Sequence, residues 1–251
     1  MKTTEIELHP GHWENENSGA TGIIKEVEEA RKVTKRVYEI LKASKVPTTY
    51  FEDNTSTNQS QNLNTLVKEH NKDQNGLVVS IHFNASGGTS DKGIGTEVLY
   101  YDQKELAENV AKAISNVSGL KNRGAKQHKN LAVLTQTYEP AILIEVCFVN
   151  DSTDVALYRR DFEKICYAIA KELAVYLGVN IEEGEKELQF TSPTLRKMYE
   201  ERLASPGTAK LLDDAAVEVL GYKSKLINGR LSDGDLNAMA IELAVHFAKK
   251  C

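Results

Sequence analysis

Before residue 180, apolar residues alternate between short continuous runs and longer segments in which they recur at helical spacing. Short runs favour strands, and apolar residues at every third or fourth position favour amphipathic helices. The pattern predicts strands at Ile6–Leu8, Val46–Phe51, Leu77–Ile81, Thr96–Tyr101, Leu131–Leu134 and Ala141–Val146. It predicts helical segments at Glu26–Ala43, Gln59–Asn71, Gln103–Ser118 and Thr153–Leu177.

Strands that alternate with helices predict an α/β fold, a mostly parallel sheet flanked by helices. Leu77–Ile81 is a compact apolar run, which is typical of a strand buried on both faces. Pro47 favours a sheet edge or a strand start, because proline has no amide hydrogen to donate. Ligand sites in such sheets form beyond the carboxyl ends of strands. His12, His82 and Glu145 all fall at or just past predicted strand ends.

The composition changes after residue 179. Residues 180–190 are charged, poor in apolar side chains and interrupted by Gly184, which is typical of a linker. Residues 191–251 contain three helical patterns, with start signals at Ser192-Pro193, Ser205-Pro206 and Ser232–Asp235. We therefore expect a main domain at 1–179 and a small helical domain at 191–251. So small a domain is a candidate for oligomerisation.

The composition excludes several classes of protein. Hydrophobic residues make up 41% and charged residues 27%, as in ordinary globular proteins. A net charge of -5 gives no general attraction to nucleic acid. We expect synthesis in the cytoplasm without a signal peptide and no membrane insertion, because no apolar stretch approaches ~20 residues. Cys147, Cys166 and Cys251 have no disulfide-framework or zinc-ribbon spacing.

Two histidines and a glutamate are candidates for a zinc site. His12, Glu26 and His82 supply the ligand types of a catalytic zinc, which usually keeps a fourth position open for water. They lie 14 and 56 residues apart along the chain, so only folding can bring them together. Since a single histidine near a strand end is often a surface residue, the spacing alone leaves both interpretations open.

Longer motifs carry a more specific signal. They are Pro10-Gly11-His12, Ser80–Ala85, Gly95–Val98, Asn122–Lys126, Leu131–Leu134 and Pro140–Asn150. In this order they closely resemble the zinc-dependent N-acetylmuramoyl-L-alanine amidases of the amidase 3 type, from about residue 6 to about residue 177. The resemblance implies hydrolysis of the peptidoglycan amide that joins the lactyl group of N-acetylmuramic acid to L-alanine.

The resemblance also implies roles for single residues. His12, Glu26 and His82 match the zinc ligands of the family, and Glu145 matches its catalytic glutamate. In general, zinc polarises a scissile carbonyl and lowers the pKa of bound water to roughly 7. A second carboxylate then takes a proton from the water and returns it to the leaving amine. Glu145 ends an apolar strand, where desolvation would raise its pKa toward the useful range.

Two positions depart from the family pattern. His9 stands where the family has aspartate, and Trp13 stands where it has glycine. His9 is therefore a competing ligand candidate, although the motif position favours the histidine three residues later. Trp13 either lines a substrate groove or packs on the core. Glu28 and Glu29 follow Glu26 in the same helix, but at about 100° per residue they should point elsewhere.

Other polar side chains have two interpretations each. Asn84 either orients a ligand or satisfies loop backbone, and Arg123 either pairs with a stem-peptide carboxylate or is a surface residue. His128 lies in a loop that the family places near the cleft, or is simply solvated. His70 and His246 lie on helical faces and are not expected to be ligands.

The expected protein is a lytic amidase that acts on the cell wall after release from the cytoplasm. It would be a phage or prophage endolysin, or a lytic enzyme of sporulation. Residues 191–251 would target it to the wall or form a homo-oligomer. Two alternatives stay open: another zinc peptidase or amidohydrolase on the same fold, and a non-catalytic cell-wall-binding protein.

Overall fold

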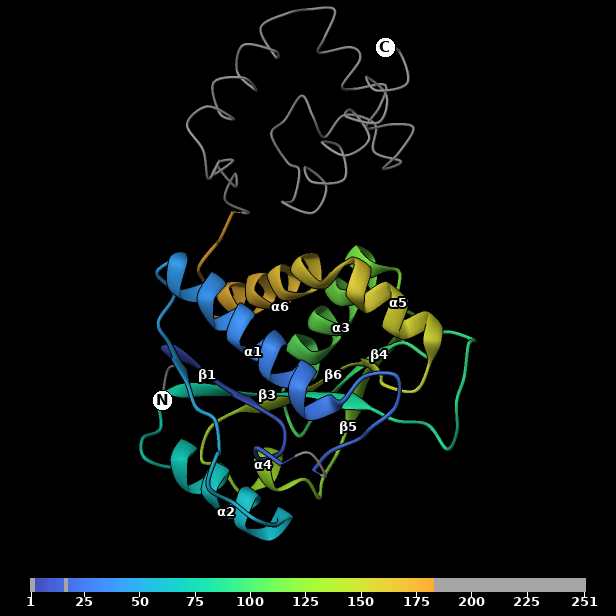
Figure 1. Ribbon diagram of the computed structural model, residues 1–251. Coiled ribbons are helices and arrows are strands. Elements are labelled where there is room, and N and C mark those ends of the chain that lie inside the picture. Colours follow the sequence, from blue (N-terminus) through green and yellow to red (C-terminus); the bar gives the residue numbers. More distant parts are fainter. Residues whose placement is uncertain (1–2, 16–17, 183–251) are drawn as a thin grey trace, which may run out of the picture. The chain divides into compact units, whose positions relative to one another are not determined.

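A six-stranded sheet organises residues 3–15 and 18–182, the part of the chain that the computed structural model describes (Figure 1). The strands are β1 (Glu5–Pro10), β2 (Thr48–Tyr50), β3 (Gly76–Asn84), β4 (Thr96–Tyr100), β5 (Asn122–Gln127) and β6 (Ala141–Phe148). Their order in the sheet is β2-β1-β3-β6-β4-β5. All neighbours are parallel except β4 and β6, which are antiparallel. The predicted α/β fold with a mostly parallel sheet is therefore confirmed.

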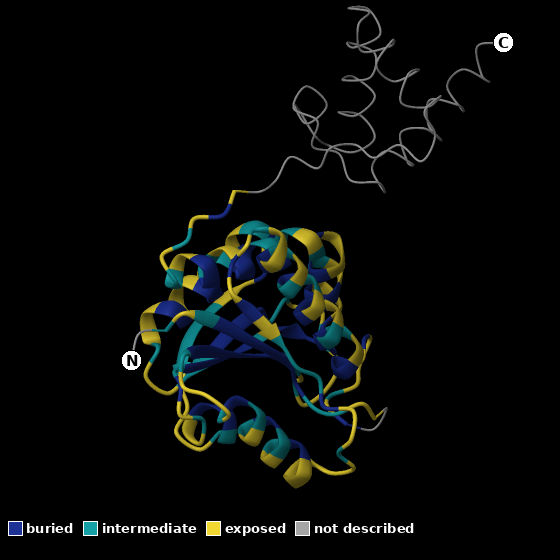
Figure 2. Ribbon diagram, turned by 90° about the vertical axis from the view of Figure 1, so that its left-hand side faces the viewer, coloured by how far each residue is buried: buried dark blue, intermediate teal, exposed yellow. Residues whose placement is uncertain are grey.

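Helices cover both faces of this sheet (Figure 1). On one face lie α1 (Glu26–Ala43), α3 (Lys104–Ser118), α5 (Ser152–Arg160) and α6 (Phe162–Tyr176). On the other face lie α2 (Gln59–His70) and the short α4 (Ala132–Thr135). Figure 2 shows buried strands between the two layers and exposed residues along the outer sides of the helices.

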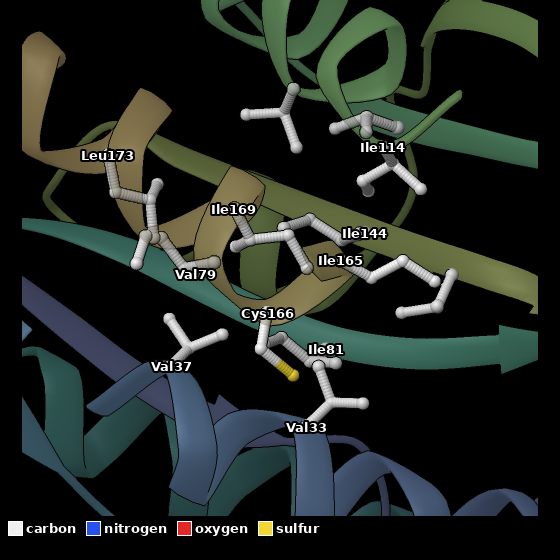
Figure 3. Close-up of a cluster of buried hydrophobic side chains, with 14 of the residues drawn as sticks. Val33, Val37, Val79, Ile81, Ile114, Ile144, Ile165, Cys166, Ile169 and Leu173 are labelled. Atoms are coloured by element: carbon white, nitrogen blue, oxygen red, sulfur yellow. The ribbon is translucent and has the colours of Figure 1, made fainter. Parts of the chain in front are cut away.

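The larger core fills the space between the sheet and helices α1, α3 and α6. Figure 3 shows Val33 and Val37 of α1 facing Cys166 of α6 across this core, with Ile81 of β3 beside Cys166. All four side chains are fully buried. Burial of an aliphatic side chain of this size contributes roughly 1.5–3 kcal/mol, so the periodic apolar positions of the helices supply much of the stability.

The opposite face of the sheet carries the polar side chains. Ile6 and Leu8 of β1 belong to the larger core, so Glu7 and His9 project to the other side, because side chains alternate along a strand. By the same alternation, His82 of β3 projects to that side. A small apolar cluster there contains Leu66, Val78, Val133, Leu134, Ala141 and Leu143. The face covered by α2 and α4 therefore holds most of the chemically active groups.

One predicted strand is wrong. Leu131–Leu134 was expected to be extended, but Ala132–Thr135 forms helix α4. The amides of Leu134 and Thr135 both donate to the carbonyl of Leu131, which closes the turn. A four-residue apolar run has no periodicity that separates a strand from a buried helical turn. Here the turn allows two consecutive side chains, Val133 and Leu134, to enter the small cluster.

Two other segments differ from the sequence pattern. Strand β5 was not predicted, because Asn122–Gln127 is polar and partly exposed and pairs only with β4 at the sheet edge. The helical segment Thr153–Leu177 is divided into α5 and α6 at Asp161. The carboxylate of Asp161 pairs with Arg160 and Lys164, which holds the break in place.

The first compact unit of the chain spans residues 1–181, and Ile181 packs on its core. The predicted linker at 180–190 lies mostly outside the described residues. The predicted helical domain at 191–251 lies wholly outside them, with His246 and Cys251, so both stay predictions. Cys147 and Cys166 are buried free thiols. Within residues 3–15 and 18–182, no helix combines the length and apolar character that a membrane span requires.

Candidate metal centre

Three side chains from distant parts of the chain converge near the carboxyl ends of β1 and β3. His12 lies in the loop after β1, Glu26 is the first residue of α1, and His82 lies near the end of β3. Glu26 Oε1 is 2.9 Å from His82 Nδ1 and 3.1 Å from His12 Nε2. One ligand atom from each residue lies within 4.8 Å of the others. These are the residues that the sequence predicts as zinc ligands, and folding brings them together.

Backbone groups fix the carboxylate of Glu26. The amide of Ala20 donates to Oε2 at 2.6 Å, and the amide of Phe83 donates to Oε1 at 3.1 Å. Burial would raise the pKa of Glu26, but hydrogen bonds with His12 and His82 hold that pKa well below its usual range. Glu26 is therefore ionised at neutral pH, the state that a carboxylate ligand needs.

The neighbouring acids of α1 point away from this group, as predicted. Glu28 is exposed and pairs with Lys25, which precedes α1. Glu29 accepts a hydrogen bond from Tyr158 of α5 and pairs with Lys32. The helical rotation thus separates Glu26 from both acids that follow it, and it is the carboxylate of α1 in the group.

The loop that carries His12 has an uncommon backbone. His12 has a φ of 64°, in the left-handed region that residues with side chains rarely adopt. The amide of Gly11 donates to the carbonyl of Ile81 at 2.7 Å, which ties this loop to β3. Strained residues of this kind persist where the surroundings hold them and are frequent at functional sites.

Gly11→Ala is expected to weaken zinc binding roughly 10- to 100-fold, the usual effect of disturbing the support of a ligand. A Cβ at position 11 would lie 2.3 Å from Cε1 and 2.4 Å from Nδ1 of His82, so the imidazole would have to move. Competition with a chromogenic chelator measures the affinity. Gly87→Ala is the matched control, because a Cβ there meets nothing within 4 Å. Equal affinities of the two variants would contradict the expectation.

A second carboxylate lies beside the three candidate ligands. Glu145 of β6 is paired in register with His82 of β3 on one side and with Glu97 of β4 on the other. In an antiparallel pair such as β4 and β6, directly opposite residues have Cβ atoms about 4.5–5.5 Å apart. Burial first, and then the charges of Glu26 and Glu97, raise the pKa of Glu145 to about 8. Its carboxyl group can therefore exchange a proton near neutral pH.

The residues fit a catalytic zinc ion. Two imidazoles and an ionised carboxylate form the nitrogen and oxygen ligand set that zinc accepts. Within the described part of the chain, Glu145 Oε2 is buried without a hydrogen-bond partner. Because buried polar atoms are normally satisfied, this oxygen marks a place where a further polar group belongs. The arrangement can therefore hold a cation beside a proton acceptor.

Glu97 is a residue of this site that sequence reasoning missed. Its Oε2 accepts from Arg123 Nε at 2.6 Å and from Lys126, and its Oε1 accepts from Asn84 Nδ2 at 3.1 Å. Burial opposes ionisation, but the bonds with Lys126 and Arg123 hold the pKa of Glu97 below its usual range. Asn84 and Arg123, the candidate substrate contacts, are thus joined to Glu97. Glu97 belongs to the motif Gly95–Val98, but its basic partners Arg123 and Lys126 lie on β5, a strand that the sequence pattern did not predict.

His9 lies outside the group of candidate ligands. Its side chain is fully buried, and its Nδ1 is 2.8 Å from Nε2 of His70. Nδ1 of His70 is in turn 2.6 Å from Oε2 of Glu7. His9 therefore belongs to a buried hydrogen-bonded chain, Glu7–His70–His9. Within the described part of the chain, neither His9 nor His70 belongs to the group of candidate metal ligands, which agrees with the sequence preference for His12.

The two remaining candidates lie nearer the surface. His128 has an exposed side chain, and its backbone amide donates to the carbonyl of Tyr100 at 2.8 Å. Trp13 is partly buried, and its Nε1 has no hydrogen-bond partner within the described residues. Trp13 follows directly on His12, but both of its predicted roles stay open.

Comparison with known proteins gives one family and a consistent fold. Residues 6–175 match the Amidase_3 family, described as N-acetylmuramoyl-L-alanine amidase. A relative in Staphylococcus saprophyticus, named probable cell wall amidase LytH, is 27% identical over 61% of this chain and 51% of its own. The chain spans about half the length of the curated relatives it matches, with 53%, 43% and 51% for three of them.

Solved structures resemble the first unit of the chain. The catalytic domain of CwlV, an N-acetylmuramoyl-L-alanine amidase from Bacillus (Paenibacillus) polymyxa var. colistinus, is 28% identical. It aligns over 72% of this chain and 100% of its own, with a TM-score of 0.57. The catalytic domain of the CD27L endolysin, which targets Clostridia difficile, shares the fold at 24% identity and a TM-score of 0.62. That alignment covers 71% of this chain and 99% of the endolysin domain.

Proposed function

Because the chain belongs to the N-acetylmuramoyl-L-alanine amidase family, we propose that it cleaves the amide between N-acetylmuramic acid and L-alanine in peptidoglycan, with zinc as its cofactor. The observation that carries this proposal is the convergence of His12, Glu26 and His82 beside Glu145. A two-imidazole, one-carboxylate set next to a proton acceptor is the arrangement that metal-assisted amide hydrolysis requires.

Each residue of the site has a role in this reaction. His12, Glu26 and His82 would hold zinc, which when bound supplies a Lewis acid that polarises the scissile carbonyl and acidifies the attacking water. Glu145 takes the proton that the water loses and delivers it to the departing nitrogen of L-alanine. The charges of Glu26 and Glu97 help to keep the pKa of Glu145 high, so this carboxylate is a stronger base than an exposed glutamate.

Incubation of the chain with purified cell walls is expected to release new amino termini that belong to L-alanine. Labelling of free amines before and after digestion, followed by acid hydrolysis, identifies the residue. Heat-inactivated chain provides the baseline. An exopeptidase on the same fold would instead release free amino acids from the end of the stem peptide. A non-catalytic wall-binding protein would sediment with the walls and release no amine, and either result would overturn the proposal.

Further parts of the proposal concern the whole protein. Hydrolysis of this amide in intact walls would lead to bacterial cell lysis, as an endolysin or a sporulation enzyme requires. Residues 191–251 would target the wall or form a homo-oligomer, and the enzyme would act after release from the cytoplasm. Lysis and release from the cytoplasm stay predictions, and so does the role of residues 191–251, which lie outside the described part of the chain.

A further inference from the structure

A group of carboxylates lies near the amino ends of the central strands, at the opposite end of these strands from the candidate zinc ligands. Glu5 and Glu7 come from the start of β1, and Asp73 comes from the loop between α2 and β3. One oxygen from each of these three residues lies within 4.8 Å of the others. His82 lies six residues after Gly76 along β3, which corresponds to roughly 20 Å between these two positions.

Glu139, just before β6, extends the group. Its side chain is 6% exposed, and its Oε1 accepts from the amide of Gly76 at 2.6 Å. A Cβ on Gly76 would lie 2.4 Å from Oε1 of Glu7, so both carboxylates lie against the same backbone. The carboxyl groups of Glu139 and Glu7 are within hydrogen-bonding reach of each other. Oε2 of Glu139 is buried, and no donor group within the described residues forms a hydrogen bond with it.

Basic side chains do not neutralise this group within the described part of the chain. The ion-pair partner of Glu7 is His70, and burial lowers the pKa of His70 to about 4, so this ring is neutral near pH 7. Lys72, next to Asp73 in sequence, pairs with Glu69 instead. Isolated buried carboxylates are costly unless a proton or a cation compensates them.

We propose that Glu5, Glu7, Asp73 and Glu139 bind a divalent cation of the hard, oxygen-preferring class, with calcium as the best fit. Calcium takes six to eight oxygen ligands, many of them carboxylates, in flexible geometry. The side of the group at Asp73 is exposed, which leaves room for water ligands. Zinc prefers imidazole, which the candidate metal centre at the other end of the strands supplies. The ion would join the starts of β1, β3 and β6.

Burial and mutual repulsion also affect the protonation of Glu7 and Glu139 in the absence of a cation. Burial first, then repulsion from Asp73, raises the pKa of Glu7 to about 7. Burial and the charge of Glu7 likewise raise the pKa of Glu139 to about 7, although the amide of Gly76 opposes this. Between about pH 4.5 and 7, the folded chain holds protons that the unfolded chain has released. Stability without a cation therefore falls as pH rises through this window, and a cation would restore it.

Thermal unfolding of the full chain with and without calcium tests the site. Zinc is kept saturating so that the other centre is filled, and the pH is 8 so that the carboxyl groups have lost their protons. Calcium up to about 10 mM is expected to raise the unfolding midpoint by at least about 2 °C. Calorimetric titration of the same sample gives the affinity.

Asp73→Asn is the informative variant, because Asp73 is exposed and its replacement leaves the core intact. We expect its calcium affinity to fall at least about tenfold, through loss of one charged ligand. Glu69→Gln is the matched control, since Glu69 is a nearby acid that pairs with Lys72, and it should keep the full calcium effect. No midpoint shift in the unchanged chain would overturn the proposal. An undiminished shift in Asp73→Asn would place the ion elsewhere and overturn it equally.

Discussion

Glu145→Gln is expected to lower amide hydrolysis by about 10²- to 10⁴-fold, the usual contribution of a positioned general acid–base group. Glutamine keeps the shape of the side chain but cannot take a proton from water or return one to the leaving amine. Zinc content should not change, because Glu145 lies beside the candidate ligands and is not one of them. Rates of amine release and zinc analysis of the same gel-filtered sample measure both effects.

The control for this variant is Glu163→Gln. Glu163 lies on α6 and pairs with Arg36 of α1, on the other face of the sheet from Glu145. Its rate should equal that of the unchanged chain. A Glu145→Gln variant that keeps full activity would remove Glu145 from the mechanism. One that loses zinc would make Glu145 a ligand instead of a proton acceptor.

Removal of zinc is the second large effect. A chelator is expected to abolish amine release, and added zinc should restore it. The activity of His82→Ala should be more than about 100-fold lower than that of the unchanged chain. Removal of a metal ligand should have a larger effect than removal of a group that only supports a ligand. Zinc at the concentration that restores the unchanged chain should not restore this variant. Its two remaining candidate ligands, His12 and Glu26, leave the site short of the usual three.

His128→Ala is the matched control for the histidine variant. His128 is exposed, lies outside the group of candidate ligands, and should tolerate alanine without loss of zinc or activity. Chelation that leaves the rate unchanged would show that amide hydrolysis on this fold proceeds without the ion. A His82→Ala variant that binds zinc as tightly as the unchanged chain would exclude His82 as a ligand.

The sequence pattern predicted the helices and strands whose positions depend mainly on their own residues. Helix α1 has apolar positions at helical spacing from Val27 to Leu41, and its predicted range matches the observed one. Pro47 predicted an edge or a strand start, and β2 is an edge strand that begins one residue later. The sequence pattern was not sufficient for segments whose secondary structure depends on contacts with neighbouring elements. Helix α4 forms because Val133 and Leu134 both fit under the sheet, and β5 forms because β4 offers it hydrogen bonds.

The candidate site likewise contains residues that the sequence predicted and environments that it could not predict. The trio His12, Glu26 and His82 was found through motifs, which carry information about the folded arrangement that spacing does not. The environment of Glu145 could not be predicted, because it depends on the antiparallel register that sets Glu97 opposite it. Likewise, nothing local to His9 shows that His70, 61 residues away, lies within hydrogen-bonding distance.

The two hydrogen bonds that link Glu7, His70 and His9 have a defined donor-to-acceptor direction once the protons of the three side chains are assigned. Burial lowers the pKa of both imidazoles, so both rings are neutral near pH 7. When Glu7 is ionised, it accepts from Nδ1 of His70, and Nε2 of His70 then accepts from Nδ1 of His9. Nε2 of His9 is left as a bare lone pair. The histidine that replaces an aspartate of the family motif thus becomes a hydrogen-bond acceptor, and its tautomer is selected by Glu7, two residues earlier in β1, through His70 of α2.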